Sequence, residues 1–162
     1  VENYFKKVMD IMKDGTGDKE TAEIPAETLN GADNTSMKLL DRTNLTPDDL
    51  GSWADKETLA QFPNGWEYVK GGGNEPIRFT INCNTLYVIF RAQNSERLGT
   101  IDVYVDGEKV MDVKGNMSSG WNNPETQWIM GGGETAEHTV EIKMADGSEE
   151  NYFWLLGFGY CD

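Results

Sequence analysis

Histidine and cysteine, on which much of enzyme catalysis and zinc binding depends, are almost absent from this chain. Its 162 residues include one histidine and two cysteines, too few for a zinc site with standard ligands. Ser-His-Asp catalysis needs a histidine beside a serine. His138 instead begins a segment whose same-side residues are apolar, which indicates a core-edge residue hydrogen-bonded to a turn. A Gly-x-Ser-x-Gly elbow is also missing. We therefore expect no catalytic site and no cofactor.

Basic residues are scarce as well, and no apolar run is long enough to cross a bilayer. The 14 Lys and Arg residues face 28 Asp and Glu residues, for a net charge of −14. Such a surface repels phosphate backbones and anionic lipids, so we expect neither nucleic-acid nor membrane partners. Because no Asp-x-Asp-x-Asp-Gly loop is present, we interpret the charge as solubility of a secreted monomer rather than as calcium binding.

The many acidic residues do not by themselves predict catalysis. A jelly-roll glycosidase needs two carboxylates that face each other across the substrate, and 28 acids supply a chance pair easily. Glu67, Glu141 and Asp102 occupy outward-facing strand positions, where a solvated carboxylate is expected. A small glycosidase or esterase stays an alternative, not the prediction.

Alternating apolar residues between 77 and 113 predict an antiparallel sheet. Ile77, Phe79, Ile81 and Cys83 fall on one face, which is the period-two pattern of a half-buried strand. After a break at 84–85, residues 86–90 are apolar on both faces and predict a central strand. The Asp-Gly at 106–107, between two alternating runs, predicts a hairpin turn.

The remaining segments complete an expected antiparallel β-sandwich, or jelly roll, over 37–162. Strands are predicted at 37–40, 66–69, 138–144 and 152–160, and short helices at 46–51 and 55–62. Residues 1–14 have the pattern of an amphipathic helix, which we interpret as the end of a preceding domain in a longer protein. Residues 15–36 have the composition of a linker or an extended draped segment. Cys83 and Cys161 fit either one disulfide or two buried thiols.

The polar segment 114–128 is the candidate binding site, because it contains two tryptophans seven residues apart. We predict a loop in which Trp121 and Trp128 stack on sugar rings, with amide and guanidinium groups bonding the hydroxyls. The alternative is that both indoles plug the end of the core. The expected hydrogen-bonding residues are Asn122, Asn123, Gln127 and Arg91. Trp66 and Tyr68, on one face of a predicted strand, form a second candidate platform.

Four runs carry a family resemblance: Leu86-Tyr-Val-Ile-Phe-Arg91, Leu98 to Lys109, Glu137-His-Thr-Val-Glu-Ile142 and Phe153-Trp-Leu-Leu-Gly-Phe-Gly-Tyr160. Over residues 64–162 the chain resembles jelly-roll accessory domains beside SGNH/GDSL-type and carbohydrate esterases of gut and rumen bacteria. It is also similar to carbohydrate-binding modules of the β-sandwich type. The resemblance implies a parent catalytic domain in the same chain. The Gly-Asp-Ser and Asp-x-x-His elements of those esterases are absent, so their activity is not implied.

The sequence thus predicts a non-catalytic module that binds plant cell-wall polysaccharide, either β-glucan or hemicellulose, for a larger secreted enzyme. A first alternative is a structural accessory domain of an SGNH-type esterase that binds no sugar alone. The small glycosidase or esterase is the second.

Overall fold

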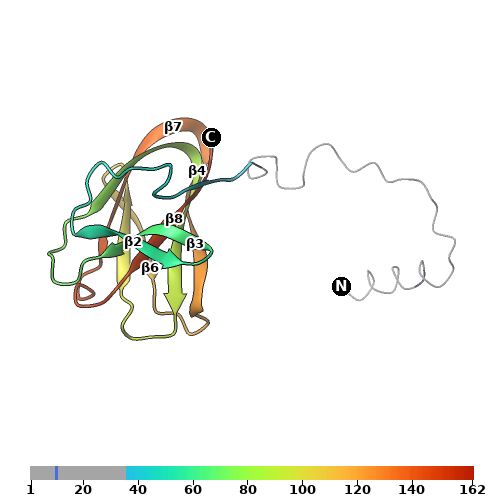
Figure 1. Cartoon of the computed structure of the whole chain (residues 1–162). Helices are drawn as coiled ribbons and strands as arrows, with labels where there is room; N and C mark the ends of the chain where they lie inside the picture. Colours follow the sequence, from blue (N-terminus) through green and yellow to red (C-terminus); the bar gives the residue numbers. More distant parts are fainter. Residues whose placement is uncertain (1–9, 11–35) are drawn as a thin grey trace. The chain divides into compact units, whose positions relative to one another are not determined.

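The computed structural model describes residue 10 and residues 36–162, and the latter belong to one compact unit (Figure 1). The expected helix at 1–14 and linker at 15–36 lie outside the described residues, apart from Asp10 and Ser36. The domain boundaries therefore stay a prediction. Between residues 36 and 162 no helix forms. Over the described residues we find no helix with the length and apolarity that a membrane span requires.

Eight antiparallel strands form the structure. They are β1 (Lys38–Leu40), β2 (Trp53–Leu59), β3 (Phe62–Tyr68), β4 (Ile77–Gln93), β5 (Thr100–Val105), β6 (Glu108–Lys114), β7 (Trp121–Met144) and β8 (Trp154–Cys161). Their order in the sheet is β2-β3-β8-β4-β7-β5-β6, and β1 pairs with β8. The predicted all-β, antiparallel fold class is confirmed.

The two long strands, β4 and β7, connect two layers of the sandwich. Residues 85–93 of β4 pair with 121–131 of β7, and this half of β4 also pairs with β8. Residues 77–83 of β4 pair with 136–142 of β7, whose end pairs with β5. The register shifts between Cys83, opposite Ala136, and Thr85, opposite Gly131, so the predicted break at 84–85 is an irregularity of pairing inside one strand. Figure 1 shows β4 and β7 arching together at this bend. We call the two halves the β8 layer and the β5 layer.

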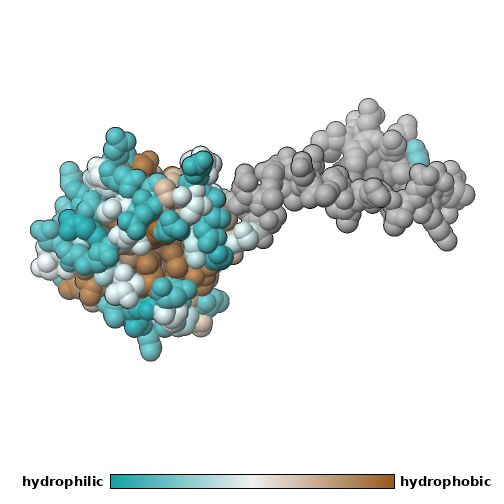
Figure 2. Space-filling view, turned by 90° about the horizontal axis from the view of Figure 1, so that it is seen from above, coloured by the Kyte–Doolittle hydropathy of each residue, from teal (hydrophilic) through white to brown (hydrophobic). Residues whose placement is uncertain are grey.

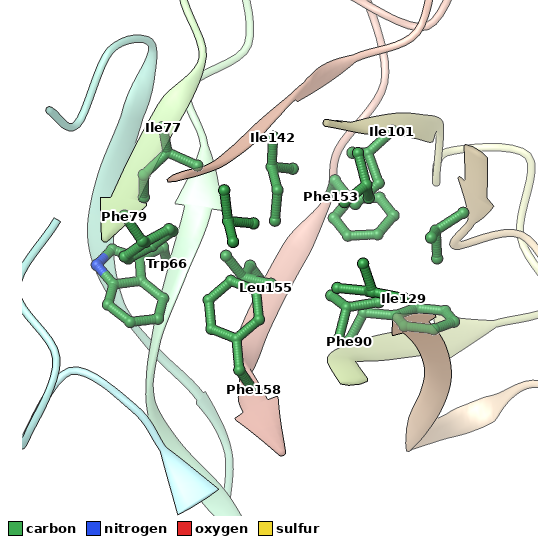
Figure 3. Packing of buried hydrophobic residues seen from close by; sticks show 14 of the residues in the cluster. Trp66, Ile77, Phe79, Phe90, Ile101, Ile129, Ile142, Phe153, Leu155 and Phe158 are labelled. Carbon is green, nitrogen blue, oxygen red and sulfur yellow. The ribbon is translucent and has the colours of Figure 1, made fainter. Parts of the chain in front are cut away.

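Aromatic rings from both layers fill the core between them. The ring of Phe79, on β4 in the β5 layer, lies 5.0 Å from Trp66 and 5.1 Å from Phe158 in the β8 layer. Figure 3 shows these side chains pointing toward one another, with Leu155 beside them. Edge-to-face pairs at such distances suit the quadrupoles of the rings. The layers are therefore fixed relative to each other.

The second predicted platform is wrong, because Trp66 and Tyr68 are 0% and 1% exposed. Both residues lie on β3, and its pairing with β8 points positions 66 and 68 into the core. The Tyr68 hydroxyl donates to the Gly73 carbonyl at 2.7 Å. Neither side chain is available to a ligand.

Two predicted helices are also wrong. Residues 48–49 are extended, because the amide of Asp48 donates to the Arg78 carbonyl and the amide of Arg78 donates to the Asp49 carbonyl, both at 2.8 Å. Residues 53–68 form the β2–β3 hairpin instead of a helix over 55–62. In both places pairing with a neighbouring strand overrides the local preference, as tertiary context commonly does.

Several strand predictions are confirmed. β4 lies between β7 and β8 at residues 86–90. The hairpin at Asp106 and Gly107 connects β5 to β6, with φ of 52° and 82°. His138 Nδ1 lies 2.8 Å from a carboxylate oxygen of Asp106, as expected of a core-edge histidine bonded to a turn.

Asp102, expected to be solvated, is instead buried and paired with Lys109 Nζ at 2.8 Å.

Candidate functional site

Two tryptophans on β7 are open to solvent. Trp121 is 88% exposed and Trp128 is 53% exposed, so neither indole plugs the core. In the register of the sheet Trp121 lies opposite Gln93 and Trp128 lies opposite Tyr87. Tyr87, Arg91 and Gln93 of β4 point away from the main core cluster, so both indoles share the outer face of the β8 layer. At about 3.3 Å per strand residue they lie roughly 20 Å apart. Between them Ile89 is covered by Leu59 and Leu156 in a second, smaller apolar cluster.

The segment that contains these tryptophans is a strand from residue 121 onward, whereas a loop was predicted. Asn123 fixes its start, because its side-chain oxygen accepts the amide of Trp121 at 2.7 Å and its nitrogen donates to Glu125 at 2.9 Å. The side chain of Asn123 is therefore engaged inside the protein. Asn122 is exposed, with a φ of 66°. This arrangement holds Trp121 on a rigid strand end.

Gln127 lies on the opposite face of β7 from Trp128, because neighbouring strand residues point in opposite directions. It is paired with the inward-facing Val88. Gln127 lines a hollow of about 470 Å³ whose other walls are Asp112, Lys114, Asn116, Met117, Ser118 and Ser119. The structure thus separates Gln127 from the indole beside which the sequence placed it.

Trp121 borders a hollow of its own, of about 380 Å³. Its lining is Gln93, Asn94, Ser118, Gly120, Trp121 and Asn122. A Cβ on Gly120 would lie 2.6 Å from the backbone nitrogen of Gln93. Glycine at position 120 therefore lets the loop approach β4 closely and places amide side chains beside the indole.

Arg91 lies on the same outer face, in a stack of planar groups that the sequence reasoning missed. Its guanidinium carbon is 4.3 Å from the centroid of the Trp154 ring. The Trp154 ring is stacked on Tyr152 at 5.8 Å with an angle of 16°. Burial lowers the pKa of Arg91, and the charge of nearby Glu67 opposes that shift.

A hollow of about 410 Å³ opens beside this stack. Its walls are Arg91, Gln93, Ser95, Arg97, Leu98, Tyr152 and Trp154. Segment 152–160 was interpreted as a buried strand. Among residues 152–155, however, Phe153 and Leu155 belong to the main core cluster and Tyr152 and Trp154 do not. The alternation Tyr152-Phe153-Trp154-Leu155 was the signal that could have identified Tyr152 and Trp154 as outward-facing.

At the other end of the outer face, Trp128 belongs to a cross-strand row with Tyr87, Gly159 and Leu39. Leu39 and Tyr87 lie on either side of Gly159 in the register of the sheet. Leu39 is 43% exposed and Met37 is 48% exposed. Figure 2, a view from above, shows strongly hydrophobic residues between hydrophilic ones on the face that it presents. In residue 10 and residues 36–162, no three His, Cys, Asp or Glu side chains come together as a metal site would require.

No protein-family model matches the chain, and no curated protein is significantly similar to it. Solved structures do resemble it. A two-domain esterase active on acetylated mannans superposes with a TM-score of 0.68 at 16% identity, over 96% of this chain and 45% of that one. This chain therefore spans less than half the length of that esterase.

Two carbohydrate-binding modules superpose over nearly their full length. The CBM36-1 domain of a multidomain xylanase from the hindgut metagenome of Trinervitermes trinervoides gives a TM-score of 0.51 at 13% identity, covering 78% of this chain and 98% of that domain. A family 35 module from Clostridium thermocellum gives 0.52 at 12% identity, covering 78% and 99%. At these identities the likenesses establish the fold. Residues 36–162 form a β-sandwich of the kind found in carbohydrate-binding modules and in a two-domain carbohydrate esterase, which confirms the fold that the resemblance implied.

Proposed function

We propose that the chain is a non-catalytic module that binds plant cell-wall polysaccharide for a larger secreted enzyme. The observation that carries this proposal is the placement of Trp121 and Trp128 on one outer face of a rigid sheet, 88% and 53% exposed. Indole rings are among the side chains most strongly favoured at binding surfaces and least favoured in open solvent. Their flat faces fit the C–H faces of pyranose rings.

The surroundings of the indoles suit a chain-like ligand. The outer face extends from Trp128 and Tyr87 at one end to Arg91 and Trp121 at the other, a span of several sugar residues that crosses the small apolar cluster over Ile89. Gln93 and Asn122 offer amide groups beside Trp121. Because an open surface buries little of a flexible chain, we expect dissociation constants in the micromolar to millimolar range.

The roles proposed for single residues follow from this geometry. Trp121 and Trp128 stack on sugar rings, and Asn122 bonds a hydroxyl beside Trp121. Asn123 positions Trp121 instead of contacting the ligand. Gln127 faces the separate hollow of about 470 Å³ and contacts sugar only if the chain crosses the edge of β7.

The structural neighbours support a module within a larger enzyme. One neighbour is a domain of a multidomain xylanase, and another is a two-domain esterase that was co-crystallized with mannopentaose. We therefore propose a parent catalytic domain in the same chain, secretion of the whole protein, and no catalytic activity in this unit.

A binding screen on insoluble cellulose, xylan, mannan, xyloglucan and pectin tests the proposal. The chain should be retained on at least one of these, and the double variant Trp121→Ala with Trp128→Ala should be released. Val110→Ala is the matched control, because Val110 is 44% exposed but lies on β6 in the β5 layer. Retention that survives the double variant would contradict the proposed surface.

The alternatives give different results in the same material. A purely structural domain would bind none of the five polysaccharides and would associate tightly with its parent catalytic domain. Release of reducing sugar or acetate from xylan or β-glucan by the purified chain would indicate an enzyme.

A further inference from the structure

We propose that the hollow between Arg91, Arg97 and Tyr152 binds the carboxylate of a uronic-acid side group on a polysaccharide. This inference rests on the proposed function and adds a second, charge-reading subsite to it. Arg91 was predicted from the sequence as a ligand-binding residue. The other residues of this hollow were not, and they include Gln93, Ser95, Arg97, Tyr152 and Trp154.

Arg91 carries a charge that the described residues do not pair. Its guanidinium stacks on Trp154 at 4.3 Å, and its Nε is buried without a hydrogen-bond partner. The nearby carboxylate of Glu67 is bonded to Lys56 Nζ at 2.9 Å. Removing a cation from water without a partner is unfavourable. A carboxylate ligand would supply acceptors to the two terminal nitrogens of the guanidinium, in the bidentate geometry that a guanidinium prefers.

Arg97 provides a second cation on the same hollow. Its side chain is exposed and forms no ion pair within residues 36–162. The backbone around it is fixed: the Tyr152 amide donates to the Arg97 carbonyl at 2.8 Å, and the Arg97 amide donates to Ser95 Oγ at 3.3 Å. The loop that carries Arg97 is therefore formed before any ligand arrives, which lowers the entropy cost of binding.

The rest of the hollow suits a sugar ring that bears the carboxylate. Tyr152 is 39% exposed, with Trp154 stacked on its ring at 5.8 Å and Lys70 Nζ 5.8 Å from the ring centroid. Gln93 and Ser95 line the same wall with hydrogen-bonding groups. Trp154 is a positioning residue, because its ring is covered by Arg91 on one side and stacked with Tyr152. The two arginines therefore face the carboxylate, and Gln93 and Ser95 face the hydroxyl groups of the same uronic-acid residue.

The spacing of the carboxylates distinguishes acidic polysaccharides. At physiological salt only charges within about 8 Å escape most screening, so the closely spaced further carboxylates of polygalacturonate meet the acidic surface of a chain whose net charge is −14. A polymer with occasional carboxylates presents one of them to the two arginines at little cost. We therefore assign glucuronate-substituted xylan, not polygalacturonate, as the ligand class.

The test compares two forms of one polymer. Native glucuronoxylan and the same material with its carboxyl groups reduced to alcohols are titrated into the full chain by calorimetry. A charge-assisted hydrogen bond predicts about tenfold tighter binding of the native form. Arg97→Gln should remove that preference, so that the native and reduced forms bind with equal affinity. Arg91→Lys, which keeps the charge but not the planar stack, should reduce the preference.

Lys143→Gln is the control for loss of one positive charge, because Lys143 lies on β7 in the β5 layer, with its Nζ 5.4 Å from the ring of Tyr104. It should retain the full preference. Equal binding of native and reduced polymer by the unmodified chain would overturn this inference and leave the proposed function standing. A preference that survives both arginine variants would also overturn it. Tighter binding of polygalacturonate than of glucuronoxylan would contradict the assigned ligand class. If neither xylan form binds and the five-polysaccharide screen is also silent, the proposed function fails as well.

Discussion

Replacing Trp121 by alanine separates a ligand-binding role from a structural role, because this indole lies almost entirely outside the protein. At 88% exposure only about an eighth of its surface is buried. A fully buried tryptophan removes roughly 250 Å² from water, and each Å² is worth about 25 cal/mol. The variant should therefore lose less than about 1 kcal/mol of folding free energy. For a chain of this size that lowers Tm by about 3 °C at most.

Trp66 is the internal comparison, since it is the same residue type at 0% exposure. Its indole ring packs on Phe79 in the core. A tryptophan-to-alanine change in a core costs about 3–5 kcal/mol, which lowers Tm by roughly 10 °C or more. Trp66→Ala should therefore destabilise the fold without altering the outer face.

The two variants are measured by thermal melts and by titration with the polysaccharide that the screen identifies. Trp121→Ala should weaken binding about tenfold, the scale of an exposed aromatic anchor, and barely change Tm. Trp66→Ala, assayed well below its lowered Tm, should retain the affinity of the unmodified chain. A Tm loss for Trp121→Ala as large as that for Trp66→Ala would refute the burial argument. An unchanged affinity would refute the binding role of Trp121.

Three further predictions concern titration, thiol chemistry and backbone fit. The hydrogen bond from His138 lowers the pKa of Asp106 in the folded protein, so its contribution is present at neutral pH and lost as pH falls below about 4. Asp106→Asn should therefore show a smaller loss of stability between pH 7 and pH 3 in urea titrations. Burial raises the pKa of Cys83 to about 11, so iodoacetamide at pH 8 should modify it only after unfolding, as mass spectrometry would detect. Gly157→Ala should lower Tm markedly, because φ is 151° and the new Cβ would lie 2.3 Å from a β1 carbonyl oxygen, whereas Gly133→Ala, with open space around it, should not.

The local sequence pattern was sufficient to predict those strands in which apolar and polar residues alternate. The turn at Asp106-Gly107 was predicted because its geometry favours glycine. The central strand at 86–90 was predicted because burial on both faces leaves an uninterrupted apolar run in the sequence. Residues 46–51 were mistaken for a helix because Thr46, Pro47 and the two acidic residues after them resemble a helix start in isolation. A second short helix was predicted at 55–62. Strand partners far along the chain decided their conformation, and no local window contains those partners.

The candidate site divides in the same way. The sequence alone determined that residues 37–162 form an antiparallel β-sandwich, that the chain carries strong negative charge and too few histidines and cysteines for a standard zinc site, and that two tryptophans lie in a polar segment. Only the tertiary structure decided that Trp66 is buried while Trp121 is exposed, because burial depends on which strand lies opposite. It also decided that Arg91 meets Trp154, since these residues are brought together by the pairing of β4 with β8, which a linear sequence does not record.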